Sequence, residues 1–209
     1  MNNRKVYISG EIVPEVDAKI SIFDSAVLLG DTVTESTRTF NFKPFKLDEH
    51  LERLYKSFKL TRIDPQMTIE EMKKVSLELL EINKDNYKAN EDCWLVHNIS
   101  RGHSITGGNP ALQVSKPTVM IYTQPMNLVL WAPFYTKGCH AVTPPTRMVP
   151  SQSLDARIKN RSRLFYTLAE IEAKLVDPDA QSVILDIHGN VAENKGCLLY
   201  TSPSPRDLA

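Results

Sequence analysis

The 209-residue chain lacks the features that mark several large classes of protein. Its three cysteines, Cys93, Cys139 and Cys197, show neither metal-ligand spacing nor a disulfide pattern, so we expect free thiols and no metal site. Lys plus Arg balances Asp plus Glu at 25 each, and no bulk charge attracts nucleic acid or an anionic membrane. No apolar run approaches the ~20 residues that span a bilayer, and no signal-peptide core follows the N-terminus. We therefore expect a cytoplasmic protein.

The composition and the first part of the chain predict a globular protein that begins with β-structure. Hydrophobic residues make up 42% and charged residues 24%, which is ordinary, and the length suits one large domain or two small ones. Short apolar runs around turns predict hairpins at residues 6–13 and 33–44, with a short β piece at 20–23. We therefore expect the first 45 residues to form an antiparallel meander.

The hydrophobic period then changes to that of a helix. Apolar residues recur at helical spacing from residue 47 to 58, at Leu47, Leu51, Leu54 and Phe58. A second helix follows, opened by the capping-box pair Thr68 and Glu71. Residues 93–100 and 118–123 read as strands, and residues 125–133 as either a linker or the first strand of a second domain.

A lysine and a carboxylate frame the last helical stretch. Four apolar residues, Leu164, Leu168, Ile171 and Leu175, predict a helix that starts near Ser162 and has one apolar face. Lys159 lies just before this helix, and Glu193 follows the next short strand and a His-Gly-Asn turn. A lysine and an acid at the ends of neighbouring elements suit pyridoxal phosphate chemistry, in which the lysine forms an imine and the acid keeps the ring nitrogen protonated.

Four stretches of the sequence together resemble the class IV aminotransferases. They are Gly30-Asp31 with Glu35 and Arg38, residues 45–54 with Ser57, residues 158–160, and residues 186–193. The resemblance covers residues 6–196 and implies an α+β, two-domain fold of the type IV pyridoxal phosphate enzymes with its second domain incomplete. It further implies a small domain at residues 1–128, the start of a large cofactor-binding domain at 129–196, and a homodimer.

The resemblance also implies roles for individual residues. Lys159 would be the catalytic lysine that carries pyridoxal 5'-phosphate as a Schiff base, Glu193 would pair with the pyridine nitrogen, and Arg53 would bind the phosphate. Arg101 and His103 resemble the Arg-x-His pair that holds the substrate carboxylate in D-amino-acid aminotransferase, and His50 reads as a structural residue. Thr34, like Leu29, stands where relatives carry aromatic residues of the substrate pocket. Each of these side chains has an ordinary alternative as a solvated or packing residue.

The resemblance leaves three functions open. The first is an aminotransferase that moves an amino group between a branched-chain or D-amino acid, or an amine, and a 2-oxo acid. The branched-chain assignment is weakened because Leu164 stands where those enzymes have a tyrosine. The second is a lyase of the aminodeoxychorismate type, and the third is an inactive fragment that binds cofactor poorly and aggregates. No metal, nucleic acid or membrane partner is expected in any of them.

The last 13 residues do not continue the pattern. Residues 197–209 have no hydrophobic period and back-translate without strain to a transposase sequencing adapter. We therefore expect this segment to be an artefact and the natural sequence to stop near Gly196, where the original gene continued.

Overall fold

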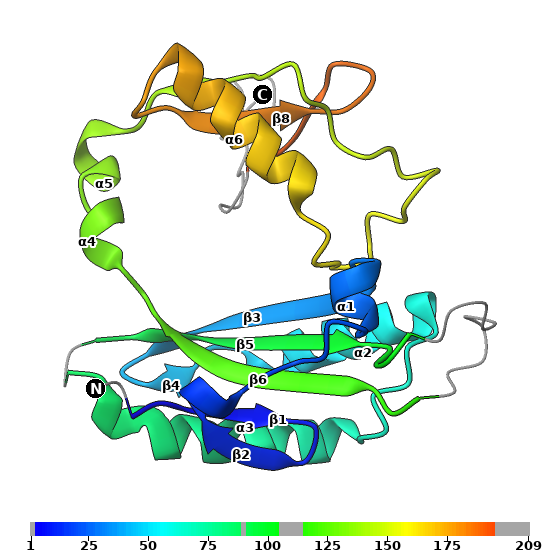
Figure 1. Cartoon of the computed structure of the whole chain (residues 1–209). Helices are drawn as coiled ribbons and strands as arrows, with labels where there is room; N and C mark the ends of the chain where they lie inside the picture. The colour runs from blue at the N-terminus through cyan, green and yellow to red at the C-terminus, as the bar shows by residue number, and fades with distance from the viewer. Residues whose placement is uncertain (1–2, 89–90, 105–114, 195–209) are drawn as a thin grey trace, which may run out of the picture. The chain divides into compact units, whose positions relative to one another are not determined.

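The structure is a computed structural model and describes residues 3–88, 91–104 and 115–194, so the predicted artefactual tail lies outside the described residues. The chain divides into two compact units (Figure 1). The first contains residues up to 127 together with 157–162, and the second contains residues 128–156 and those from 163 onward. The predicted domain boundary after residue 128 stays a prediction. The segment 157–162 packs with the first unit, although it lies in the range assigned to the second domain.

The first unit is built on an antiparallel sheet in the order β2-β1-β6-β5-β3-β4. Its strands are β1 (Lys5–Ile8), β2 (Glu11–Pro14), β3 (Thr32–Phe40), β4 (Lys43–Pro44), β5 (Cys93–Ser100) and β6 (Thr118–Pro125). The helices of this unit are η1 (Glu15–Asp17), α1 (Ser25–Leu28), α2 (Leu47–Thr61), α3 (Ile69–Asn83) and η2 (Lys84–Asn86).

The two hairpins at the start of the chain are confirmed, but the predicted meander is wrong. β1 pairs with β6 and β3 pairs with β5, so the two hairpins are separated in the sheet by strands from later in the chain. Residues 20–23, predicted as a β piece, form no strand. Local patterns locate strands correctly here, whereas the choice of neighbour depends on tertiary packing that they do not encode.

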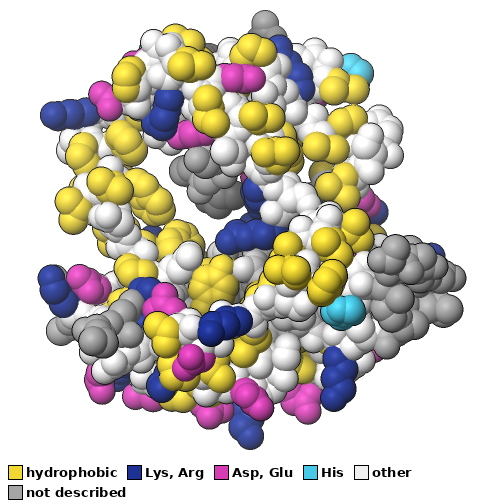
Figure 2. All heavy atoms as spheres, in the orientation of Figure 1, with side chains coloured by type: hydrophobic (Ala, Val, Ile, Leu, Met, Phe, Trp, Pro, Cys, Tyr) yellow, Lys and Arg dark blue, Asp and Glu magenta, His cyan; other side chains and the backbone are white. Residues whose placement is uncertain are grey.

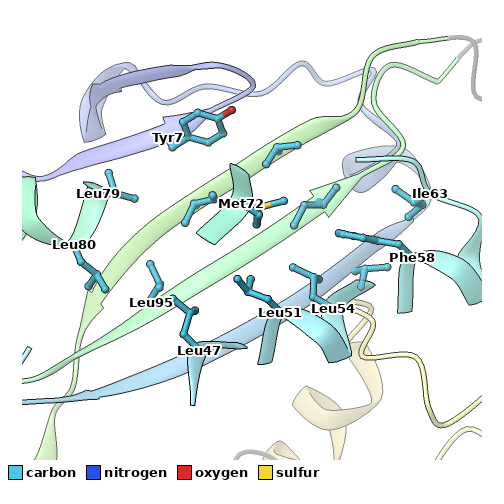
Figure 3. Close-up of a cluster of buried hydrophobic side chains, with 14 of the residues drawn as sticks. Tyr7, Leu47, Leu51, Leu54, Phe58, Ile63, Met72, Leu79, Leu80 and Leu95 are labelled. Atoms are coloured by element: carbon cyan, nitrogen blue, oxygen red, sulfur yellow. The ribbon is translucent and has the colours of Figure 1, made fainter. Parts of the chain in front are cut away.

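Helices α2 and α3 cover one face of this sheet and close the core (Figures 1 and 3). Figure 3 shows Leu51 and Leu54 of α2 and Met72 of α3 gathered over Leu95 and the other strands. These four side chains are fully buried, and each such burial contributes roughly 1.5–3 kcal/mol. The predicted capping box of α3 is confirmed, since the Thr68 side chain accepts from Glu71 N and the Glu71 carboxylate accepts from Thr68 N.

The second unit contains a three-stranded sheet in the order β7-β8-β9, against which α6 packs. Its elements are α4 (Leu128–Trp131), α5 (Phe134–Lys137), β7 (Ala141–Val142), α6 (Leu164–Val176), β8 (Gln181–Leu185) and β9 (Val191–Asn194). The stretch 125–133, read as a linker or a strand, thus contains a short helix. β8 and β9 form the antiparallel hairpin that carries Glu193.

Helix α6 packs through a different face from the predicted one. Its buried residues are Tyr166, Ala169, Glu170 and Ala173. The residues of the predicted apolar face are exposed by 73, 46, 53 and 82% at Leu164, Leu168, Ile171 and Leu175. Small alanine side chains allow a helix backbone to approach a sheet closely, which explains the choice of face. Figure 2 shows hydrophobic side chains along the visible side of this helix.

Within the part of the chain that the structure describes, no helix is both long and apolar enough to cross a membrane.

Candidate functional site

The segment that carries Lys159 is hydrogen-bonded along β3. Thr34 N donates to Lys159 O at 2.8 Å, Arg161 N donates to Thr32 O at 2.9 Å, and Asn160 forms a β-bridge with Val33. Backbone hydrogen bonds on both sides of Lys159 fix the direction in which its main chain runs. The lysine is therefore part of the first unit, beside the strand that holds Thr34.

Two further contacts hold this segment in place. Lys159 N donates to the Ser57 hydroxyl of α2 at 3.3 Å, and the Ser162 hydroxyl donates to Gly30 O at 2.9 Å. Gly30 has φ of +66°, and a Cβ at this position would lie 2.5 Å from Ser162 Oγ. Glycine is required here both for the left-handed backbone and for the close approach of the lysine segment.

A buried carboxylate lies under α2, close to this segment. Glu35 is the neighbour of Thr34 on β3, and its side chain is fully buried. Arg53 of α2 donates to it through two nitrogens, with Nε–Oε2 at 2.6 Å and Nη2–Oε1 at 2.7 Å. His50 Nδ1 lies 3.1 Å from Oε1 of the same carboxylate. Arg53 and Ser57 are four residues apart on α2 and so share one face of the helix. The predicted phosphate ligand and the predicted catalytic lysine thus belong to adjoining segments.

These contacts change the acidity of two groups on β3 and β5. Burial alone would raise the pKa of Glu35, but hydrogen bonds from His50, Arg53 and the Ser36 N–H, together with the charge of Arg53, lower it to about 2. Burial lowers the pKa of His97, the residue paired with Glu35 across the strands, to about 4. Near neutral pH the sheet therefore holds an ionised carboxylate beside a neutral imidazole.

The three residues predicted to bind substrate all have other contacts. Thr34 is 1% exposed and donates its hydroxyl to His97 O. Arg101 donates to Asp31 and to the carbonyls of Thr61 and Arg62 at the end of α2, contacts that support a bracing role. The predicted role of these two residues in substrate binding stays a prediction.

His103 lies apart from the lysine segment. Its ring packs against Phe23 with centroids 5.8 Å apart, and its backbone forms a bridge with Asp24. A shallow pocket beside the lysine segment does not include this residue. The pocket has a volume of about 160 Å³ and is lined by Ala26, Gly30, Thr32, Asn98, Met120 and Arg161.

Glu193 lies in the second unit, on β9. Its carboxylate accepts a hydrogen bond from the hydroxyl of Tyr166 on α6. Burial raises the pKa of Tyr166, as do the hydrogen bond and negative charge of Glu193, so this phenol stays protonated and keeps donating. The sequence analysis missed Tyr166, because an aromatic residue on an amphipathic helix reads as core.

The sequence analysis also missed Glu35 as a member of the candidate site. The available signal was a single acid in a Thr-rich strand, followed by a helix whose His50 and Arg53 share one face. Taken together, the first unit offers a lysine and a forked cation on adjoining segments, and the second offers a hydrogen-bonded carboxylate. A phosphorylated aldehyde with a basic ring nitrogen fits this set of groups.

Comparison with known proteins identifies relatives along most of the chain. The family model described as Amino-transferase class IV matches residues 32–197. A putative branched-chain-amino-acid aminotransferase of Methanocaldococcus jannaschii is 35% identical over 192 residues, covering 92% of this chain and 63% of that protein. A D-alanine aminotransferase of Staphylococcus epidermidis is 32% identical over 120 residues, covering 57% of this chain and 41% of that protein.

The fold has a solved counterpart. A branched-chain amino acid aminotransferase from T.th., crystallised with pyridoxamine 5'-phosphate, superimposes with a TM-score of 0.78 at 24% identity. The match covers 94% of this chain and 63% of that one. The predicted fold is therefore confirmed, and the chain spans less than two thirds of the length of these relatives.

Proposed function

The chain belongs to the class IV aminotransferase family, and we propose that it forms part of an aminotransferase that uses pyridoxal 5'-phosphate and has Lys159 as its catalytic lysine. When bound, this cofactor supplies an electron-withdrawing ring that makes the α-proton of an amino acid labile. Lys159 Nζ holds the cofactor aldehyde at rest and moves that proton during turnover. Arg53 binds the phosphate, and Glu193 keeps a proton on the ring nitrogen.

One observation carries this proposal. The main chain of Lys159 is hydrogen-bonded to Thr34 and Ser57, next to the pair formed by Glu35 and Arg53. The two groups that must reach opposite ends of one small cofactor therefore come from adjoining segments of a single unit. Tyr166, by donating to Glu193, fixes the orientation of a carboxylate that could otherwise rotate.

Borohydride trapping tests the catalytic lysine directly. We expect the chain, treated with millimolar pyridoxal 5'-phosphate and then reduced, to carry the pyridoxyl group on the peptide containing Lys159. Lys137, exposed on α5, provides the matched control: Lys137→Ala should leave the labelling unchanged, and Lys159→Ala should abolish it. Predominant labelling of any other lysine would overturn the assignment of Lys159.

The substrates form a finer part of the proposal. Relatives named for branched-chain amino acids and for D-alanine support a small amino acid as donor and a 2-oxo acid as acceptor. A panel of L- and D-amino acids and amines would establish the donor. A lyase releases product without any acceptor, whereas an aminotransferase stops after one turnover, so omitting the 2-oxo acid separates the two activities. The predicted cytoplasmic location belongs to the same proposal.

We also propose that the protein assembles with a second copy of itself. The segment around α1 carries five apolar side chains that are each more than half exposed, namely Ile22, Phe23, Val27, Leu28 and Leu29. Hydrophobic side chains are visible over α1 in Figure 2. Exposed apolar clusters of this kind commonly mark protein interfaces. Sedimentation of the chain and of a Leu28→Asp variant tests this: the variant should shift toward monomer, and a wild-type chain that is monomeric at micromolar concentration would contradict it.

A further inference from the structure

The carboxylate of Glu35 is used on both of its oxygens. Oε2 accepts from Arg53 Nε, and Oε1 accepts from Arg53 Nη2, with the Ser36 N–H and His50 Nδ1 also within 3.1 Å of Oε1. Two parallel N–H···O bonds of this kind fix the plane of the guanidinium as well as its position. Because Glu35 is fully buried on a central part of β3, the carboxylate cannot follow the arginine if α2 shifts.

The rest of the Arg53 guanidinium points away from this contact. Its Nε and Nη2 are occupied by Glu35, while the side chain as a whole remains 50% exposed. Among the described residues Nη1 has no hydrogen-bond partner. A guanidinium clamped on one edge and open on the other can present its free N–H groups to an anion without losing side-chain freedom at that moment.

We propose that Glu35, supported by His50, is a positioning residue that holds Arg53 in the orientation needed to bind the phosphate of the cofactor. This inference rests on the proposed function, because it takes the phosphate role of Arg53 as its starting point. It adds a role for a carboxylate that makes no contact with the phosphate itself. The side chain of Ser57, one turn along α2, ties the same helix face to the main chain of Lys159.

A structural ion pair that only fastens α2 to β3 would predict a different outcome. Removing a negative charge beside a cation strengthens the attraction of that cation for an anion, by Coulomb's law. If Glu35 merely anchors the helix, its neutral analogue should therefore bind phosphate compounds as tightly as the wild type or more tightly. If Glu35 positions the arginine, the neutral analogue should bind them more weakly, despite the more positive local charge.

The experiment compares pyridoxal 5'-phosphate with pyridoxal, which lacks the phosphate. Dissociation constants of both compounds are measured by absorbance titration for the wild type, Glu35→Gln and Arg53→Ala. We expect Arg53→Ala to weaken binding of the phosphorylated compound by roughly 10- to 100-fold, and Glu35→Gln by roughly tenfold. Binding of pyridoxal should stay unchanged in both. In the double variant, Glu35→Gln should add nothing to Arg53→Ala, because its effect acts through the arginine.

A second ion pair provides the matched control. Arg4 and Glu15 form the same two-nitrogen contact elsewhere in the first unit, at 3.0 and 2.8 Å, so Glu15→Gln should leave both dissociation constants unchanged. If Glu35→Gln fails to fold by circular dichroism, Glu35→Asp decides instead. It keeps the charge but withdraws the carboxylate, and it should also weaken binding of the phosphorylated compound alone.

The outcomes separate this inference from the proposed function. If Arg53→Ala leaves the affinity for pyridoxal 5'-phosphate unchanged, the phosphate role of Arg53 fails and the inference fails with it. If Arg53→Ala weakens binding but Glu35→Gln does not, only the positioning role is overturned. A Glu35 variant that weakens both compounds equally would also overturn it, since that result indicates general damage to the unit.

Discussion

Helices α2 and α6 carry the same spacing of apolar residues and use it in opposite ways. In α2 the residues Leu47, Leu51, Leu54 and Phe58 are at most 6% exposed and form the centre of a core. In α6 the residues at the matching positions, Leu164, Leu168, Ile171 and Leu175, are 46–82% exposed. The sequence period alone therefore identifies a face of a helix and leaves open what lies against it.

The difference follows from what each helix has to pack against. Helix α2 lies on a six-stranded sheet together with α3, and large side chains fill the space between them. Helix α6 lies on a three-stranded sheet, and its contact face is made of Ala169 and Ala173 with Tyr166 and Glu170 beside them. A helix can thus bury its small residues and leave its large apolar ones outside.

The largest expected effect comes from truncating matched leucines. Leu51→Ala should lower the free energy of unfolding by about 2–5 kcal/mol, because it leaves a cavity in the core. Leu168→Ala, at the same position of the pattern in α6, should cost less than about 1 kcal/mol. Urea unfolding would be followed through Trp94 in the first unit or Trp131 in the second, with the other tryptophan replaced by Phe. Equal losses would mean that both faces are covered.

Acid should loosen α2 before α6. The folded pKa values of His97 and Glu35 lie below their unfolded values, so each group stabilises the fold at higher pH and loses that contribution as pH falls. The windows are about 6.5 to 4 for His97 and about 4.5 to 2 for Glu35, whose charge also faces His50 and Arg53. Hydrogen exchange from pH 7 to 3 should show faster exchange in α2, and Glu35→Gln should flatten the lower part of that dependence. Parallel behaviour of the two helices would contradict this expectation.

Enlarging the contact face of α6 should have a moderate effect. Ala173 is fully buried, so Ala173→Leu should cost about 1–3 kcal/mol through overpacking against the sheet. Thermal unfolding of the second unit, followed through Trp131, measures it. A neutral result would indicate that α6 can turn and bury the leucine face instead.

The smallest effect is expected at the end of the exposed face. Leu175 is 82% exposed, and Leu175→Ser should change the free energy of unfolding by no more than about 0.5 kcal/mol. Its effect should appear in self-association, measured by light scattering at high protein concentration. A large loss of stability would show that another part of the molecule covers this residue.

The same contrast explains how much of the fold could be predicted from the sequence. Features that depend on nearby residues were predicted correctly, including the hairpin of β1 and β2, the capping box of Thr68 and the helix α2. Features that depend on distant partners were predicted wrongly, namely the order of strands in the sheet and the buried face of α6. Pairing between distant segments is decided by packing, which a local period does not record.

The candidate site divides along the same line. Lys159, Arg53 and Glu193 were predicted from motif order and spacing, and the structure places the first two on adjoining segments. Glu35 escaped notice because a lone acid in a strand normally faces water, and its burial makes sense only once α2 supplies Arg53 and His50. Arg101 shows the opposite case, since the groups that occupy it are main-chain carbonyls that no sequence pattern reveals.

The strand order of the first sheet also has a consequence during translation. β1 and β3 each pair with a strand from the region 93–125, so neither early hairpin can join the sheet until the ribosome has made β5 and β6. Until then both hairpins present open strand edges, the kind of surface on which nascent chains misassemble. Chaperones that shield such edges should therefore act on this chain while roughly its first half is outside the exit tunnel.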